Sequence, residues 1–266
     1  MAERIIQVAP DFWNIRGVFK IAGVLDIATQ ASLVRLGSGN FLFLDSYAND
    51  EALRGELHAI TGGAAGIEAI VNLHPFHTVH VERMHEWYPQ ARLYGTRRHL
   101  ERFPHLPWEA VRSEEAGLQE RYADDLKFTI PRGVDFISTN ENIHFSSVMA
   151  YHRASGTIHV DDTLMYTVLP RPLQLLGLRD SVGFHPTLPM ALEKRPGAAA
   201  DFREWAGQLI AEWGEAQNLC AAHTGALLAE HPLDAVPVFD GMAAAGGRLY
   251  ISLENGRVVC MEGIAK

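Results

Sequence analysis

The strongest constraint on the fold of this 266-residue chain is a repeated pattern, in which a residue that can bind metal follows a strand-like segment. The apolar segment 67–73 ends directly before His74, and short apolar runs of this kind are typical of buried β-strands. Three later segments end in the same way, at His144, at Asp161-Asp162 and at His223. Because α/β sheets keep their sites in the loops beyond the strands' carboxyl ends, we expect these side chains to converge.

The order of the predicted elements favours an α/β fold. Residues 31–45 predict two strands around the turn Gly37-Ser-Gly-Asn40, and residues 48–60 predict a helix that ends at Gly62. A further helix is expected over 78–88. Further strands are expected over 92–95, 127–129, 134–138, 142–144, 147–152 and 157–161. Strands in both halves of the chain, with helices between and after them, predict a four-layer αββα sandwich.

One long amphipathic helix is predicted over residues 198–214, with an apolar stripe at Phe202, Trp205, Leu209, Ile210 and Trp213. We expect Trp205 and Trp213 to belong to the core. The segments after it are expected to be a short strand over 218–222, helices over 226–230 and 234–244, and a terminal hairpin over 248–260 that turns at Asn255-Gly256.

A lid-like insertion is predicted over residues 166–197. This segment contains five prolines and no clear periodicity, and long irregular segments of this kind are usually lids or binding loops. No linker divides the sequence. We therefore predict one domain over residues 1–266.

The composition excludes several classes of function. A net charge of −9 without a basic stretch argues against nucleic acid and anionic membranes as partners. Two distant cysteines, Cys220 and Cys260, imply no disulfide framework. No signal peptide or transmembrane run is recognised. These features favour a cytoplasmic protein that acts on a small molecule. The oligomeric state is left open, and a homo-oligomer is one possibility.

The densest group of histidines is His74, His77 and His80, which follows the strand at 67–73. If a helix begins here, His77 and His80 share one face of it and His74 reaches in from the loop. Neutral imidazole is a common ligand of zinc and other first-row metals. Three histidines in seven residues therefore favour a metal site over the alternative, which is that they cap the helix or face solvent.

The other candidate residues occur singly. Asp162 either binds metal or caps a turn before Thr163. Strand alternation turns His159 and Asp161 away from Asp162, so His159, like His152, is interpreted as a core residue or one that holds a ligand in place. His185 lies in the proline-rich insertion, where it is either an ordinary loop residue or a group that contacts substrate or donates a proton.

At these positions the chain resembles the metallo-β-lactamase superfamily. That family carries a His-x-His-x-Asp-His loop after a strand, then a lone His, an Asp in a Gly-Asp-type turn and a final His. The order and spacing agree from about residue 31 to residue 225. The matching stretches are Ile70-Val-Asn-Leu-His74-Pro-Phe-His77, Ile143-His144-Phe-Ser-Ser-Val148, Ile158-His-Val-Asp-Asp162-Thr-Leu164 and Ala221-Ala-His223-Thr-Gly225.

The first motif departs from the family pattern. Its Asp falls on Phe76 or on Thr78, depending on the alignment, so His77 and His80 compete for one ligand role. The Gly that should precede the bridging Asp is Asp161. Since the missing Asp normally binds a second metal ion, its loss favours one ion, or an altered pair that uses His80.

The resemblance implies a hydrolase that uses one or two zinc ions, with iron as an alternative metal, to activate water. Asp162 would bridge or orient the ions. The substrate would be an ester, lactone or amide of a small, partly hydrophobic molecule, and Arg171 or Arg179 would meet a carboxylate. The rival hypothesis is a non-catalytic relative that binds a ligand or partner. The predicted metal ligands are His74, His77, His80, His144, Asp162 and His223.

Overall fold

The computed structural model describes residues 4–21, 25–26, 28–167, 181–222, 226–228, 237–245, 248–253 and 258–262. The chain divides into two compact units. One is Ile5–Leu228, and the other combines Met1–Arg4 with Ala229–Lys266. The prediction of a single domain over 1–266 stays a prediction.

The first sheet of the larger unit has six strands in the order β1-β2-β5-β6-β7-β8. Pairing is antiparallel from β1 to β6 and parallel from β6 to β8. The strands are β1 (Ile5–Ala9), β2 (Phe12–Gly17), β5 (Thr29–Arg35), β6 (Phe41–Leu44), β7 (Ile67–Val71) and β8 (Arg92–Tyr94). A two-residue pair, β3 (Lys20–Ile21) and β4 (Leu25–Asp26), lies between β2 and β5 in the sequence.

Helices connect the parallel strands of this sheet. α1 (Glu51–Thr61) begins where the Asp50 carboxylate accepts the Leu53 amide at 2.8 Å, and it ends at Gly62 in the left-handed conformation. The 3₁₀ turn Ala64–Gly66 leads into β7, and α2 (Val81–Trp87) leads from β7 to β8. Two short helices follow β8, α3 (Arg97–Arg102) and α4 (Ala116–Arg121).

The second sheet has five strands in the order β15-β14-β11-β10-β9. They are β9 (Leu126–Thr129), β10 (Met149–His152), β11 (Thr157–Val160), β14 (Asn218–Ala221) and β15 (Ala226–Leu227). β11 and β14 are parallel, and the other pairs are antiparallel. Between β11 and β14 the chain forms the strand pair β12 (Leu164–Thr167) and β13 (Ser181–Phe184), α6 (Leu188–Ala191) and the long helix α7 (Ala198–Trp213).

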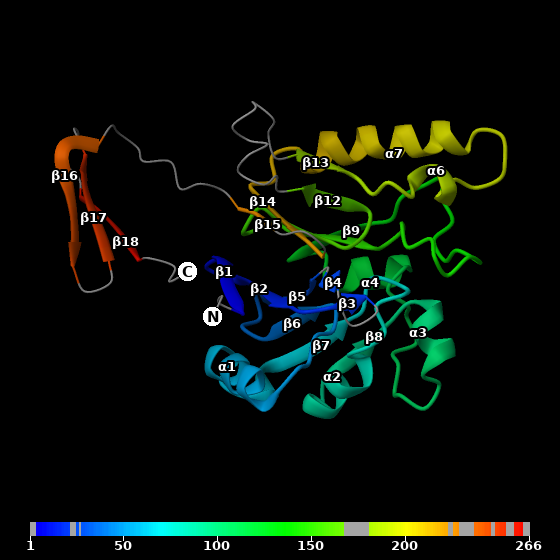
Figure 1. Ribbon diagram of the computed structural model, residues 1–266. Helices are drawn as coiled ribbons and strands as arrows, with labels where there is room; N and C mark the ends of the chain where they lie inside the picture. The colour runs from blue at the N-terminus through cyan, green and yellow to red at the C-terminus, as the bar shows by residue number, and fades with distance from the viewer. Residues whose placement is uncertain are drawn as a thin grey trace. The chain divides into compact units, whose positions relative to one another are not determined.

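Among the described residues of the larger unit, three separate apolar cores define four layers. Leu42 and Leu44 of β6 pack with Val148 and Cys220 of the other half, between the two sheets. Phe43, which points the opposite way, packs against the residues of α1 and α2. The outer face of the second sheet packs against Phe202, Trp205 and Trp213 of α7. Figure 1 shows this order, with α7 on one outer face and α1 and α2 on the other. The predicted αββα sandwich is confirmed.

The expected strands at 134–138 and 142–144 are absent from this described part of the chain, which is loop over 130–148. Local hydrogen bonds of polar side chains account for the difference. The Ser138 hydroxyl accepts the Asn140 amide at 3.1 Å, and the Asn140 carboxamide oxygen accepts the Asn142 amide at 3.0 Å. Such bonds compete with a strand ladder.

The expected helices at 226–230 and 234–244 were also wrong where these residues are described. Residues 226–227 form β15, which pairs with β14. Residues 237–245 form β16 (Pro237–Ala245), which pairs with β17 (Arg248–Leu253). Pairing with a neighbouring strand overrides a weak local preference. The terminal hairpin is observed as β17 and β18 (Val258–Glu262), while its turn residues, Asn255-Gly256, lie outside the described residues.

The insertion predicted over 166–197 is more regular than expected where it is described. β12 and β13 pair over Leu164–Thr167 and Ser181–Phe184, and α6 follows. Residues 168–180 lie outside the described residues. None of the described helices combines the length and the apolar character that crossing a membrane requires.

Candidate metal centre

The loop after β7 is held in place by a buried carboxylate of the neighbouring strand. Asp45 directly follows β6, with a backbone φ of 60°, a left-handed conformation that Asp adopts more readily than most residues. Its Oδ1 accepts the amide of Leu73 at 2.8 Å and that of His74 at 3.4 Å. Because β6 and β7 are parallel, Asp45 lies beside the residues that follow β7.

A first cluster joins this loop to the end of β11. His74 Nε2 lies 3.3 Å from Asp162 Oδ2, and His77 Nε2 lies 3.8 Å from the same oxygen. The two imidazole rings are stacked, with centroids 4.1 Å apart. His74 is fully buried, whereas the His77 side chain is 22% exposed. The three side chains therefore offer ligand atoms within 4.8 Å of one another.

A second cluster lies beside the first and is buried throughout. It consists of Asp45, His159 and Asp161, whose ligand atoms also lie within 4.8 Å of one another. His159 Nε2 is hydrogen-bonded to Asp45 Oδ2 at 2.9 Å. His77 links the two clusters, because its Nδ1 lies 3.6 Å from Asp161 Oδ1.

Polar side chains join the two sheets behind these clusters. Ser32 Oγ of β5 is hydrogen-bonded to His159 Nδ1 of β11 at 2.9 Å. The Gln30 carboxamide donates to the carbonyls of Val160 and Cys220, at 2.9 and 3.0 Å. Arg16 donates to the Ala221 carbonyl at 2.7 Å, at the end of β14. The carboxyl ends of β11 and β14 are thus tied to the first sheet.

Burial and the neighbouring charges shift the pKa values of the two ligand histidines in opposite directions. Burial would lower the pKa of His77, but the charges of Asp161 and Asp162 outweigh it and raise this pKa to about 9. Burial, together with the charge of His77, lowers the pKa of His74 to about 3. His74 is therefore the neutral imidazole at neutral pH, which is the form that binds metal.

The two remaining acids of the second cluster are shifted in opposite directions. Burial and the charge of Asp45 raise the pKa of Asp161 to about 6. Burial acts in the same direction on Asp45, but its hydrogen bond to His159 lowers the pKa below the usual range. Strongly perturbed groups of this kind concentrate at functional sites.

The donor set and its electrostatics fit a divalent metal ion. Imidazole nitrogens and carboxylate oxygens are the ligands that zinc and iron use in proteins. Both carboxylate oxygens of Asp161 are buried and have no hydrogen-bond partner among the described residues. A buried carboxylate without hydrogen bonds is costly unless a cation compensates it.

The structure brings together three of the predicted ligands, His74, His77 and Asp162. His80 is the N-cap residue of α2, and its Nδ1 is hydrogen-bonded to the Ala48 carbonyl at 3.0 Å, outside both clusters. His144 stacks on Phe76, with ring centroids 4.6 Å apart, and its Nε2 contacts the Glu141 carbonyl. Its ring centroid is 6.1 Å from that of His74.

The other predicted site residues are placed as follows. His185 has its Nδ1 hydrogen-bonded to the Thr187 hydroxyl at 2.7 Å, and its backbone amide donates to Thr163, which follows Asp162. His152 lies outside both clusters and is hydrogen-bonded to Ser155 at 2.8 Å. His223, Arg171 and Arg179 lie outside the described residues.

The final list of predicted ligands did not include Asp45, His159 or Asp161, although Asp161 belongs to the strand-end pair Asp161-Asp162 that the sequence pattern singled out. Alternation along β11 did place His159 and Asp161 on the same face, away from Asp162. Alternation does not indicate that this face of β11 is buried against the other sheet. A carboxylate and an imidazole on inward-facing positions of two strands would have been the pattern to seek.

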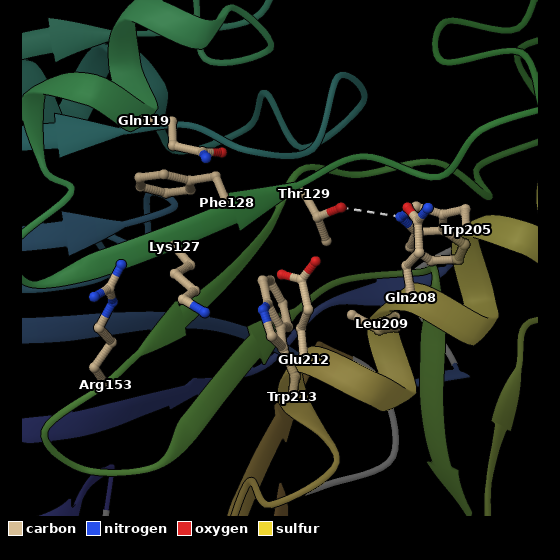
Figure 2. A pocket seen from close by; sticks show the side chains of 10 residues that line it. All are labelled: Gln119, Lys127, Phe128, Thr129, Arg153, Trp205, Gln208, Leu209, Glu212 and Trp213. Carbon is tan, nitrogen blue, oxygen red and sulfur yellow. Dashed lines mark hydrogen bonds between the residues drawn. The ribbon is translucent and has the colours of Figure 1, made fainter.

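A separate groove of about 280 Å³ lies between the edge strand β9 and the second half of α7 (Figure 2). Its lining includes Lys127, Arg153 and Glu212 beside the ring of Trp213. The Trp205 indole donates to Thr129 Oγ1 at 2.9 Å at one end. None of the lining residues belongs to either cluster, so the groove is distinct from the candidate metal centre.

Solved metallo-β-lactamase structures are similar to this chain across most of its length. One from Erythrobacter litoralis, with β-mercaptoethanol in its active site, shares 13% identity and gives a TM-score of 0.56, covering 84% of this chain and 90% of that one. One from Hirschia baltica shares 12% identity and gives a TM-score of 0.55, covering 86% and 93%. This chain therefore has the metallo-β-lactamase fold. No family model matches the sequence, and no curated protein matches it.

Proposed function

We propose that this protein is a metal-dependent hydrolase whose metal is held by His74, His77 and Asp162. The observation that carries the proposal is the convergence of these side chains from two different strand ends, with atoms 3.3 and 3.8 Å apart. The metallo-β-lactamase fold supports it, because the cluster lies at the carboxyl ends of β7 and β11. His144 and His223 are retained as proposed further ligands.

A bound zinc ion would lower the pKa of a water molecule toward ~7 and polarise the oxygen under attack. The chain's own residues prepare the site for it. His74 is neutral and fully buried, its Nδ1 accepts the Phe76 amide at 3.2 Å, and its Nε2 faces Asp162 at 3.3 Å. Asp162 faces both histidines and holds them on one side of the site. His185, whose backbone is bonded to Thr163, is the proposed group for contacting substrate or donating a proton.

The proposed substrate is a small, partly hydrophobic ester, lactone or amide. Two apolar side chains lie in the ligand loop itself and support this class. The Phe76 ring centroid is 6.0 Å from that of His74, and Val79 is 69% exposed. Arg171 and Arg179 remain proposed contacts for a substrate carboxylate. Zinc is the proposed metal, with iron as the alternative, since both suit nitrogen and carboxylate ligands.

The test is elemental analysis of protein purified without chelator or histidine tag, followed by assays on aryl esters and lactones. At least one zinc or iron ion per chain is expected, together with hydrolysis that Asp162→Asn abolishes. His152→Gln is the matched control, because it changes a buried histidine outside both clusters. Less than about one ion in ten chains after metal is supplied would contradict the proposal, since structural and catalytic sites bind metal tightly. Full metal loading without hydrolysis would favour the non-catalytic relative.

A further inference from the structure

We propose that Asp45, His159 and Asp161 form a second, fully buried site for a divalent transition-metal ion, adjacent to the first. The inference deepens the proposed function by placing a second ion on residues that the sequence motif does not supply. This inference rests on the proposed function only in one respect, which is that both sites would bind a divalent transition-metal ion. The two sites would adjoin, because Asp161 and Asp162 are consecutive and His77 contacts one carboxylate of each cluster.

Two of the three ligands of this second site, His159 and Asp45, have one end fixed and the other turned into the cluster. His159 Nδ1 is bonded to Ser32 Oγ at 2.9 Å, which leaves Nε2 facing Asp45. Asp45 Oδ1 accepts backbone amides, which leaves Oδ2 facing His159. Metal ligands are commonly oriented in this way by hydrogen bonds from their far side.

Asp161 provides an independent observation that points to a cation. Its side chain is 1% exposed, and neither carboxylate oxygen has a hydrogen-bond partner in the described part of the chain. An isolated buried carboxylate is strongly destabilising unless a cation lies against it. The cationic group that the structure places near it, His77, is 3.6 Å away.

The charge of the cluster also calls for a cation. Asp45 and Asp161 are two buried acids within 4.8 Å of each other, and the imidazoles against them are His159 within the cluster and His77 at its edge. No lysine or arginine among the described residues forms an ion pair with either acid. One nitrogen and two carboxylate ligands suit zinc, iron or manganese. The alternative is a proton shared between Asp45 and Asp161.

The experiment measures metal stoichiometry, not activity. Chelator-treated full-length protein is titrated with Zn²⁺ by calorimetry, and Co²⁺ is used in parallel for its visible absorption spectrum. Wild type is expected to bind two ions. His159→Gln and Asp161→Asn are each expected to retain one ion and to weaken the other by more than ~100-fold, beyond the ~10–100-fold cost of altering an outer hydrogen bond. His74→Gln is expected to retain the second ion.

Two variants protect the test against misfolding. Asp161→Asn is nearly isosteric and breaks no hydrogen bond among the described residues, so it keeps the test valid if His159→Gln does not fold. His152→Gln, as the matched control, is expected to bind two ions. One ion in wild type, unchanged in Asp161→Asn, would overturn the second site and leave the proposed function intact. One ion that both His74→Gln and Asp161→Asn abolish would also overturn it, and no binding in wild type would overturn both.

Discussion

His77 differs from its sequence neighbours His74 and His80 because its side chain contacts both clusters. Its two nitrogens face different carboxylates, Asp161 at 3.6 Å and Asp162 at 3.8 Å. Its backbone carbonyl is hydrogen-bonded to the buried His99 ring at 3.3 Å. The residue is therefore fixed by its main chain as well as by its side chain, and it belongs to both clusters at once.

At the residue scale, we predict that His77→Ala lowers metal affinity by at least ~100-fold, while His80→Ala changes it by less than ~10-fold, because a ligand matters more than an outer contact. His80 is bonded to the Ala48 carbonyl and packs edge-on against Tyr47, away from the clusters. Calorimetric titration of both variants with Zn²⁺ checks the prediction. A normal His77→Ala beside a metal-free His80→Ala would reverse the assignment of the ligand.

A second prediction at this scale concerns pH and His152. Burial lowers the pKa of His152 below its usual value of 6.5, although Asp125 and Asp11 oppose the shift. The pKa of His152 is therefore lower in the folded chain than in the unfolded chain. As the pH falls below about 6.5, the unfolded chain takes up more protons at this residue, and the free energy of unfolding decreases. We expect the free energy of unfolding of His152→Gln to fall less between about pH 7 and pH 5 than that of wild type. Urea denaturation of chelator-treated protein measures it, and equal slopes would contradict the assignment.

At the element scale, α7 is held on the second sheet by one face only. Trp205 is 3% exposed and donates to Thr129, whereas Ile210, which belongs to the same predicted apolar stripe, is 72% exposed. The stripe predicted from the sequence was thus too wide. Helical spacing identifies the buried face but does not fix how far a flat sheet covers the helix.

We predict that Trp205→Ala destabilises the protein by about 3–5 kcal/mol, the usual cost of removing a buried aromatic side chain. Ile210→Ala, on the same helix, should change stability by less than about 0.5 kcal/mol because the residue is exposed. Denaturant unfolding of both variants checks the contrast. Similar losses for the two variants would mean that α7 does not pack as described.

A second element-scale prediction concerns the approach of the 130–148 loop to α7. Gly133 has a φ of 72°, and a Cβ there would lie 2.0 Å from the Ala198 carbonyl oxygen. Gly133→Ala must therefore move the backbone, and we expect a loss of roughly 1–3 kcal/mol, as for other strained backbone positions. Gly207→Ala is the control, because a Cβ at that helical position meets no atom within 4 Å. Equal melting temperatures for both variants would contradict the close approach.

At the scale of the whole molecule, the sequence allowed the layers to be predicted but not the side-chain contacts between the two sheets. Strand alternation and helix caps are local, and the αββα order followed from them. The contact between Asp45 and His159 joins residues 114 positions apart. No periodicity indicates which inward-facing residues of two packed sheets will meet, so the first cluster was predicted largely from its motif and the second was missed.

The whole molecule should also be stabilised by its metal. An ion present at about 100 times its dissociation constant adds about 2.7 kcal/mol to the free energy of unfolding, which corresponds to a rise in Tm of roughly 5–10 °C for a unit of this size. We expect Zn²⁺ to give this rise in wild type and chelator to reverse it. Asp162→Asn should show a smaller rise, and an identical response in that variant would place the bound ion elsewhere.

The polar connection between the sheets has a consequence for anyone who transplants this site. A grafted loop that carries His74 and His77 would arrive without Asp45, which holds its backbone, and without Ser32, which orients His159. Gln30 fixes the ends of β11 and β14 from the opposite sheet. The smallest transferable unit is therefore the facing pair of sheet edges, and engineering that widens the gap between them would separate the ligands of the two clusters.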